Sequence, residues 1–285
     1  MTTPVVNISP NNPVFDLPVY VARDEGLFQR AGIEVRFQAK YSERRPSDAD
    51  PFQRLKEALF EQGKADVYNL CEWAGIDRSE KSARGAQVLA LRPAVAAQAI
   101  LSFDKSVQEP RDLAGVPIGI NERTGSHYTT LQSLEGVLAR TDIVVEHVGV
   151  PERRYQALKE RASRAVAVME PFISLGLKEG AHIVDLTFYR GAEVIAPHLT
   201  PEQRQAYLSA INEAADRIMA DFGKYKHYVT EQTGALAPHE LSSHYVRYTH
   251  YMVYEPQRFQ QVYEWMRSWG LASGEADHAR VVASF

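Results

Sequence analysis

Residues 121–138 combine a backbone pattern and side chains that could bind an anion. They follow a short apolar run, residues 116–120, that is typical of a buried strand. Thr124, Gly125 and Ser126 interrupt the pattern, and apolar side chains then recur at helical spacing. We expect Ser126 to cap this helix by accepting a bond from a first-turn N–H group. The free N–H groups and positive dipole end could hold a carboxylate, sulfonate or phosphate; a plain strand–turn–helix joint is the alternative.

His127 and Tyr128 belong to the first turn of the same predicted helix. His127 could donate a hydrogen bond to a ligand or act as a general acid or base, because its ordinary pKa lies near neutrality. A surface or capping histidine is an equally good interpretation. Tyr128 completes the segment 124–128 that would form the anion cradle, so it is also a ligand-binding candidate.

A second group of reactive side chains follows the predicted strand 66–71. Glu72 could act as a general acid or base, because burial would raise its pKa. Trp73, next to it, could contact a ligand in the same cleft. Cys71 could be a nucleophile, although a lone cysteine is more often a small core residue.

The elements that must hold these groups alternate between strands and helices along most of the chain. Strands are predicted at residues 5–8, 33–37, 66–71, 87–92, 98–103, 116–120, 143–148, 165–168 and 182–186. We expect Asp16 to cap the first helix, a capping box to start a helix at Thr200, and helices from there to the end. The alternation predicts a mainly parallel sheet with helices on both faces.

Nine strands are many for one compact unit of this length, so we expect two sheets that face each other across a cleft. Loops at the carboxyl ends of the strands should line this cleft. Arg92, at a predicted strand end, could clamp an anion with two hydrogen bonds, and a hinge salt bridge is the alternative. Glu170 and Arg190 also lie at predicted strand ends and could contact a ligand or pair across the cleft.

The composition of the 285 residues, 45% hydrophobic and 24% charged, is typical of a globular protein. A net charge of −4 without a basic stripe argues against a nucleic-acid partner. The single cysteine excludes an internal disulfide. His239, His244 and His250 lack the spacing of a helical metal-binding pair, so we predict no metal site and no cofactor.

No run of about 18 apolar residues occurs, so we predict no insertion into a membrane. The first residues show neither the basic segment nor the apolar core of a signal peptide, which predicts a cytoplasmic protein. A periplasmic location is the alternative if the native chain carries a signal that this sequence lacks.

Four segments, in order along the chain, resemble the periplasmic-binding-protein-like superfamily. The resemblance is to the group that binds alkanesulfonates, nitrate, taurine and thiamine pyrimidines. Residues 18–35 (PVYVARDEGLFQRAGIEV) resemble its first helix and second strand. Residues 62–66 (QGKAD), 112–119 (DLAGVPIG) and 169–172 (MEPF) resemble the start of its third strand, its entry to the second lobe and its "EP" loop.

The resemblance implies an α/β fold of two lobes with a small ligand between them. The first lobe would comprise residues 1–93 and be completed by 196–285, and the second would comprise 94–195. Members of the group contact ligand between their first strand and first helix, where this chain has Asn11, Asn12 and Phe15. An Asn-Pro turn that binds nothing is the alternative for these positions.

The superfamily includes transport receptors, sensors and enzymes, so fold alone does not decide between binding and catalysis. Our first hypothesis is a solute-binding protein of an ABC transporter, which takes up a small anionic or aromatic molecule and has a membrane permease as a possible partner. The second is a cytoplasmic lyase or decarboxylase acting on an aromatic acid, with Glu72 and His127 as the acid and base. Aryl-sulfinate desulfinases carry their nucleophilic cysteine where this chain has Asn12, and the cysteine-rich motif of thiamine-pyrimidine synthases is absent.

Overall fold

The computed structural model describes residues 3–43 and 50–284. Within these residues, nine strands form one sheet, in the order β2-β1-β3-β8-β4-β7-β5-β6, with β9 paired to β4. The strands are β1 (Val5–Ile8), β2 (Glu34–Phe37), β3 (Val67–Cys71), β4 (Gln87–Ser102), β5 (Ile118–Ile120), β6 (Val145–His147), β7 (Ala165–Val168), β8 (His182–Ile195) and β9 (Val246–Tyr248).

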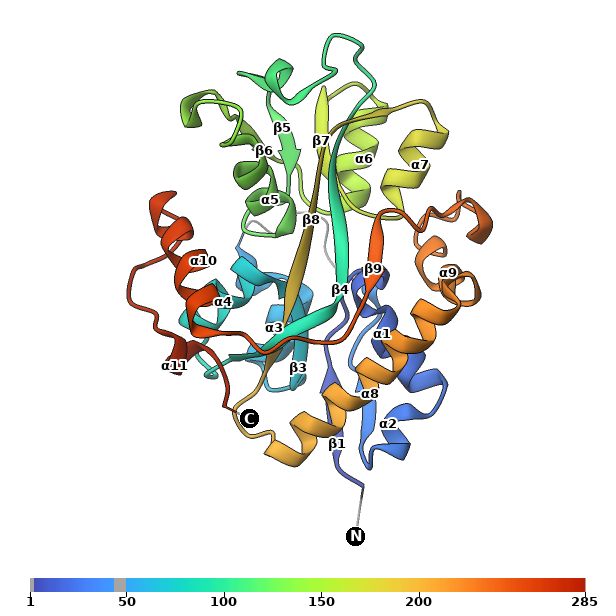
Figure 1. Cartoon of the computed structure of the whole chain (residues 1–285), viewed down its shortest axis with the longest axis vertical. Coiled ribbons are helices and arrows are strands. Elements are labelled where there is room, and N and C mark those ends of the chain that lie inside the picture. Colours follow the sequence, from blue (N-terminus) through green and yellow to red (C-terminus); the bar gives the residue numbers. More distant parts are fainter. Residues whose placement is uncertain (1–2, 44–49, 285) are drawn as a thin grey trace.

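Two long antiparallel strands, β4 and β8, run through both halves of the molecule (Figure 1). At one end, β1, β2 and β3 form the first lobe with α1 (Pro13–Asp24), α2 (Leu27–Arg30), α3 (Leu55–Glu61) and α4 (Glu72–Lys81). At the other end, β5, β6 and β7 form the second lobe with α5 (Gly125–Leu134), α6 (Pro151–Lys159) and α7 (Phe172–Lys178).

The prediction of two separate sheets is wrong, because β4 does not end before Pro93. A register shift between Leu91 and Val95 accommodates the proline, and the strand continues to Ser102. In the same way, β8 continues beyond the predicted residues 182–186 and pairs with both β3 and β4. Arg92 and Arg190 therefore lie inside long strands and not at strand ends.

Two predicted helix caps are also wrong. Asn12 caps α1, because its side-chain oxygen accepts a bond from the Val14 N–H group at 3.0 Å. Asp16 lies one turn further on, inside the helix. Thr124 is the N-cap of α5, and Ser126 lies in the first turn, where its hydroxyl accepts a bond from the Asn121 N–H group at 2.9 Å.

The C-terminal part is less helical than predicted. It contains α8 (Pro201–Ala220), α9 (Phe222–Thr230), α10 (Pro256–Ser268) and α11 (His278–Val281). Residues 231–255 contain β9, which pairs with β4, together with turns and one 3-10 turn at Pro238–Glu240. The capping box predicted at Thr200 is confirmed by reciprocal bonds with Gln203. No helix in the described part of the chain is both long and apolar enough to cross a membrane.

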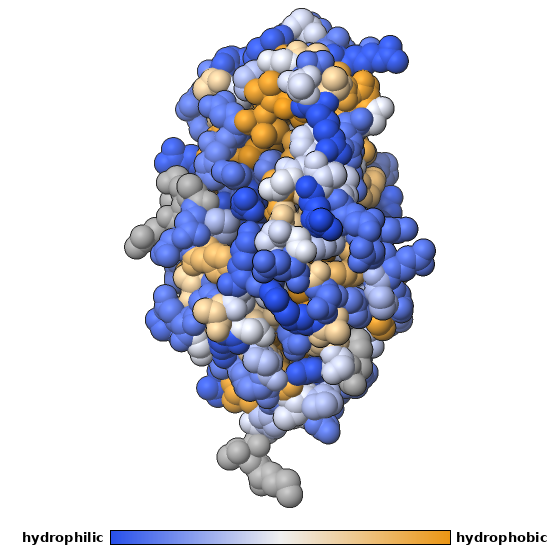
Figure 2. Space-filling model, turned by 90° about the vertical axis from the view of Figure 1, so that its left-hand side faces the viewer, coloured by the Kyte–Doolittle hydropathy of each residue, from blue (hydrophilic) through white to orange (hydrophobic). Residues whose placement is uncertain are grey.

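Helix α10 connects the two lobes on the side away from α8 and α9 (Figure 1). On the first lobe, Arg258 donates two hydrogen bonds to the carboxylate of Glu72. On the second, the indole N–H groups of Trp265 and Trp269 both donate to the carboxylate of Glu135. Seen from this side, the surface is mostly hydrophilic, and hydrophobic side chains gather at the end formed by the second lobe (Figure 2).

Candidate functional site

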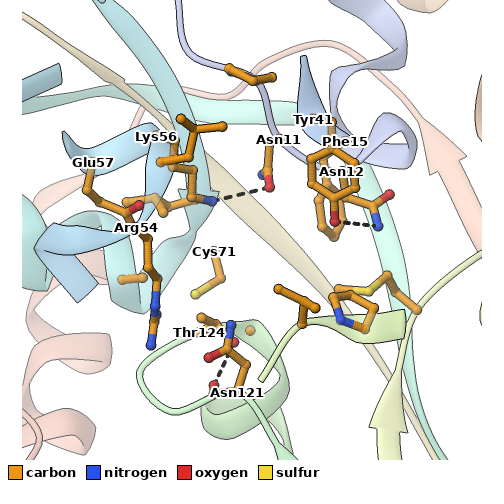
Figure 3. A pocket seen from close by; sticks show the side chains of 18 of the residues that line it. Asn11, Asn12, Phe15, Tyr41, Arg54, Lys56, Glu57, Cys71, Asn121 and Thr124 are labelled. Atoms are coloured by element: carbon orange, nitrogen blue, oxygen red, sulfur yellow. Dashed lines mark hydrogen bonds between the residues drawn. The ribbon is translucent and has the colours of Figure 1, made fainter. Parts of the chain in front are cut away.

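A cavity of about 120 Å³ lies between the lobes, at the ends of β1, β3, β5 and β7 (Figure 3). It occupies the place where open α/β sheets bind ligands, outside the carboxyl ends of parallel strands. Several residues selected from the sequence line it, namely Asn11, Asn12, Phe15, Cys71, Thr124 and Gly125. The structure thus brings together both predicted segments that follow β1 and β5.

Four helices begin at this cavity. Their N-cap residues, Asn12 of α1, Cys71 of α4, Thr124 of α5 and Val150 of α6, all line it. The first N–H groups of a helix have no acceptor within the helix, and the helix dipole places partial positive charge there. Only Asn12 among these four residues uses its side chain to cap its helix. The cavity is therefore surrounded by partial positive charge.

Gly125 allows a close approach, as expected, but the neighbour is a side chain of this protein. A Cβ atom at Gly125 would lie 2.6 Å from the hydroxyl oxygen of Tyr189. Tyr189 extends from β8 and lines the cavity. The glycine thus lets the start of α5 pack directly against this tyrosine.

Lys56 adds a full positive charge to the cavity wall. Its ammonium group donates to the side-chain oxygen of Asn11 at 3.2 Å (Figure 3). It also donates to the main-chain oxygen of Asn69 at 3.2 Å. Burial lowers the pKa of Lys56 from 10.5 to about 8, against the opposing effect of Glu57. The amine is therefore still mostly protonated at neutral pH and is poorly hydrated, which favours pairing with a buried anion.

Two arginines of the wall make structural contacts. Arg154 is 1% exposed, and its guanidinium donates to the main-chain oxygens of Ala167, at 2.7 Å, and Gly149. Arg54 donates to the main-chain oxygen of Glu122 at 2.8 Å, across the gap between the lobes. These cations still contribute to the positive potential of the cavity.

The rest of the wall is largely apolar and aromatic, with Phe15, Leu70, Val150, Met169 and Tyr189 among its members. The ring of Phe15 packs edge-on against that of Tyr189, with centroids 5.9 Å apart. A cavity of about 150 Å³ holds one benzene molecule, so the space here matches a single small ring or a short chain.

A buried polar network supports the side chains on the β1 side of the cavity. The carboxylate of Asp16 accepts bonds from the Asn11 N–H group and the Asn69 amide, each at 2.6 Å. Burial raises the pKa of Asp16 from 3.8 to about 6, although the bond from Asn11 lowers it. The network fixes Asn11 and Asn69, and these two residues supply both acceptors of Lys56.

Arg92 does not line the cavity but supports it from behind. Its guanidinium carbon lies 3.8 Å from the ring centroid of Phe15, and the group donates to the Leu70 oxygen at 2.9 Å. The side chain is 1% exposed. Phe15 lines the cavity and packs on the Arg92 guanidinium, whereas Arg92 itself does not line it. The predicted direct clamp on an anion is therefore not what the structure shows.

Glu193 lies in β8 and gives the protein a testable pH dependence. It is 2% exposed and accepts a bond from the Tyr207 hydroxyl at 3.1 Å. Burial raises its pKa from 4.5 to about 7, so the folded protein keeps a proton that the unfolded chain releases. The contribution of this proton to the free energy of unfolding is fully present below pH 4.5 and is lost as the pH rises through 7. Between pH 5 and 8 the loss is about 2 kcal/mol.

Replacing Glu193 by glutamine should therefore raise the free energy of unfolding at pH 8 and change it little at pH 5. Urea unfolding at both pH values measures the difference. Glu146→Gln, at an exposed position of β6, is the control and should leave both values unchanged. An identical pH slope in Glu193→Gln and the wild type would contradict the expectation.

The acid and base suggested by the sequence are not assembled at the cavity. Glu72 is 2% exposed, and its carboxylate points away to α10, where Arg258 donates to it at 2.6 and 2.7 Å. His127 is 7% exposed and accepts the Arg123 N–H group on Nδ1 at 3.1 Å. Burial lowers the pKa of His127 from 6.5 to about 4, so the ring is neutral at pH 7.

Trp73 and Tyr128 also lie away from the cavity. Their rings stack on each other, with centroids 5.7 Å apart, where α4 of the first lobe meets α5 of the second. Trp265 of α10 packs against both rings. The two residues thus form part of the contact between the lobes, because the helical turn directs them to the face opposite the cavity.

Glu170 and Arg190 have structural partners instead of a shared ion pair. The carboxylate of Glu170 accepts bonds from the Ser174 hydroxyl, at 2.6 Å, and N–H group, at 3.0 Å. Burial raises the pKa of Glu170 to about 7. Arg190 donates to the main-chain oxygen of His250 at 2.9 Å. Neither residue lines the cavity.

Cys71 lines the cavity, but its chemistry is unfavourable for a nucleophile. Burial raises the pKa of the thiol from 9.0 to about 11, although the nearby Ala74 N–H group opposes this. The reactive thiolate is therefore scarce at neutral pH. Among the described residues, no group of three or more His, Cys, Asp or Glu side chains is placed to hold a metal ion.

Several lining residues were not predicted, among them Lys56, Asn121, Arg154, Met169 and Tyr189. Lys56 and Arg154 lie in the first turns of α3 and α6. Asn121 and Met169 directly follow predicted strands, so the rule that ligands bind at strand ends could have found these two. Tyr189 carried no local signal, because the predicted strand stopped three residues before it.

A scan against protein-family models found no match, and a search of curated proteins found none either. Solved structures, in contrast, match nearly the whole chain. The alkanesulfonate-binding protein SsuA from Xanthomonas axonopodis pv. citri, bound to MOPS, has a TM-score of 0.77 with 14% identity over 99% of each chain. The ligand-binding component of an ABC-type import system from Staphylococcus aureus has a TM-score of 0.74 with 16% identity over 98% of this chain and 96% of that one.

An enzyme also matches. The desulfurization enzyme DszB has a TM-score of 0.65 with 14% identity over 98% of this chain and 96% of the other. At such identities the similarity establishes the fold, which both binding proteins and an enzyme share. The chain has the two-lobed α/β fold of the periplasmic-binding-protein-like superfamily, as its four sequence segments predicted.

Proposed function

We propose that the protein binds a small organic anion, whose apolar body is about the size of one aromatic ring, in the cavity between its lobes. The observation that carries this proposal is the convergence of four helix N-termini and Lys56 on one cavity. Each helix end stabilises a nearby negative charge by about 0.3–1 kcal/mol, and more where water is excluded. The apolar and aromatic walls would cover the body of the ligand.

The charges of the wall support an anion in preference to a cation. Among the described lining residues, Arg54, Lys56 and Arg154 are cationic and Glu57 is the single carboxylate. A sulfonate or carboxylate is favoured, because either offers several acceptors to helix N–H groups that point at it from different directions. The name of the structurally similar alkanesulfonate-binding protein adds support for the sulfonate.

We propose further that the protein acts as the solute-binding component of an ABC transporter and delivers this anion to a membrane permease. The support is the fold shared with an ABC-type import component. That role would place the protein outside the cytoplasmic membrane. A cytoplasmic location would instead fit a sensor that uses the same cavity.

The test uses two probes of the same size. Benzenesulfonate carries a charge, and benzenesulfonamide is its neutral counterpart. We expect calorimetry to show binding of benzenesulfonate with Kd on the order of 10 μM and of benzenesulfonamide at least about 30-fold more weakly. Native mass spectrometry of the freshly purified protein should reveal any ligand that stays bound. Equal affinity for the two probes, or no binding of either, would refute the proposal.

The alternative of a lyase acting on an aromatic acid has less support. It draws on the desulfurization enzyme with the same fold, whereas Glu72 and His127 both lie outside the cavity. Product formed from an aromatic acid during incubation with the protein would favour it over simple binding.

A further inference from the structure

The turn between β5 and α5 connects two residues of the cavity wall, Asn121 and Thr124. Its Arg123 has φ = 54°, in the left-handed region that non-glycine residues rarely adopt. Such a conformation persists only where surrounding contacts hold it. The start of α5, and with it one of the four positive helix ends, depends on this turn.

The second lobe holds the turn from one side. The Arg123 N–H group donates to Nδ1 of His127 at 3.1 Å, which requires a neutral imidazole with its hydrogen on Nε2. The Glu122 N–H group donates to Nδ1 of His147 at 3.1 Å. The Thr124 hydroxyl donates to the Asn121 oxygen at 2.7 Å and closes the turn.

The first lobe holds the same turn from the other side. Arg78 of α4 donates from Nη2 to the main-chain oxygen of Arg123 at 2.9 Å. Arg54 donates to the neighbouring oxygen of Glu122 at 2.8 Å. The main-chain oxygens of Glu122 and Arg123 thus both accept hydrogen bonds from guanidinium groups of the first lobe.

Arg78 is fully buried, at 0% exposure, and is held on its own lobe by two carboxylates. It pairs with Asp77, and its Nε lies 3.7 Å from an oxygen of Glu57. Asp77 also lies 3.5 Å from the Arg123 guanidinium, so the ion cluster spans both lobes. Separating the lobes would expose this cluster to water and release the Arg123 oxygen.

We propose that Arg78 is a positioning residue that couples the approach of the two lobes to the shape of the anion site. It does not touch the cavity. It sets the Arg123 turn, and the turn presents the first N–H groups of α5 to the ligand when the lobes are together. The effect of Arg78 on the anion site rests on the proposed binding function. The effect of Arg78 on the Arg123 turn can be measured without any ligand.

The ligand-free measurement is hydrogen exchange of single amides. In the wild type, the Arg123 amide should exchange at least about a hundredfold more slowly than in an unstructured peptide. In Arg78→Lys, which keeps the charge but loses the forked donor, this amide should exchange about tenfold faster than in the wild type. The Glu135 amide, bonded to the Leu131 oxygen at the far end of α5, is the internal control and should not change.

The binding measurement asks whether a second substitution, at position 123, restores the affinity lost in Arg78→Lys. Arg78→Lys should weaken benzenesulfonate binding about tenfold. Adding Arg123→Gly should restore the affinity to within about threefold of the wild type, because glycine adopts the left-handed turn unaided. Adding Arg123→Val should not, because a β-branched residue disfavours that conformation. If Arg78 had a merely structural role, Arg123→Gly would not restore the affinity that Arg78→Lys loses.

The proposal is overturned if Arg78→Lys folds with unchanged exchange and affinity, or if glycine at position 123 fails to rescue. If Arg78→Lys does not fold, the single variants Arg123→Gly and Arg123→Val test the proposal instead. Equal exchange rates of the amide at position 123 and equal benzenesulfonate affinities in these two variants would refute the proposal. If the wild type binds no benzenesulfonate, the proposed function fails, while the exchange of the Arg123 amide still decides the role of Arg78.

Discussion

Replacing Lys56 by methionine is expected to weaken benzenesulfonate binding by between about tenfold and a hundredfold, the effect of losing a hydrogen bond to a charged group. Methionine keeps the length of the side chain and its apolar contacts but removes the only ammonium group among the described lining residues. Calorimetry at pH 7 measures the change. Affinity for neutral benzenesulfonamide should be unaffected, because that probe gains nothing from the charge.

The affinity of the wild type should also depend on pH. Because burial lowers the pKa of Lys56 to about 8, the amine loses its proton as the pH rises through this value, and binding of the anion should weaken. Lys56→Met should lack this fall. Lys64→Met, at an exposed position, is the matched control and should bind like the wild type. Unchanged affinity in Lys56→Met would place the anion elsewhere in the cavity.

Replacing Gly191 by alanine is expected to lower the free energy of unfolding by about 3–4 kcal/mol. Gly191 lies in β8 opposite Cys71 of β3. A Cβ atom there would lie 2.1 Å from the Leu70 oxygen and 2.2 Å from the guanidinium carbon of Arg92. Both neighbours are buried and bonded to each other, so neither can move away cheaply.

Urea unfolding of Gly191→Ala measures this loss. Gly136→Ala is the control, because the nearest atom to a Cβ at that position, the Ser133 oxygen, is 3.8 Å away. We expect the control to change stability by less than about 0.5 kcal/mol. A Gly191→Ala protein as stable as the control would show that β8 and Arg92 can shift together. Benzenesulfonate affinity should also fall in Gly191→Ala, because Arg92 supports Phe15.

Much of the fold could be predicted from the sequence. The strands predicted at 5–8 and 165–168 coincide with β1 and β7, and the helix predicted from Thr200 begins with its capping box. These features depend on residues within one or two turns of each other, so local patterns suffice. The two-lobed fold was predicted from four ordered segments and is confirmed by the structural similarity.

For the site, the sequence located the loops but not the side chains within them. Asn12 and Thr124 were expected at strand-to-helix turns and do line the cavity. Glu72 begins a helix at the same edge, yet its carboxylate is turned toward Arg258, 186 residues further along the chain. No local pattern contains that partner, so the direction of Glu72 could not be predicted.

The sequence by itself determined that strands and helices alternate along most of the chain, and hence that helices would begin near the carboxyl ends of strands. The tertiary structure alone decided that β4 and β8 join both lobes, that Tyr189 faces the cavity while Arg190 bonds to His250, and that Arg78 reaches the Arg123 turn. The physical reason is how far apart along the chain the interacting residues lie. Backbone propensities and caps act over a few residues, whereas the direction of a side chain depends on what packs against it from distant parts of the chain.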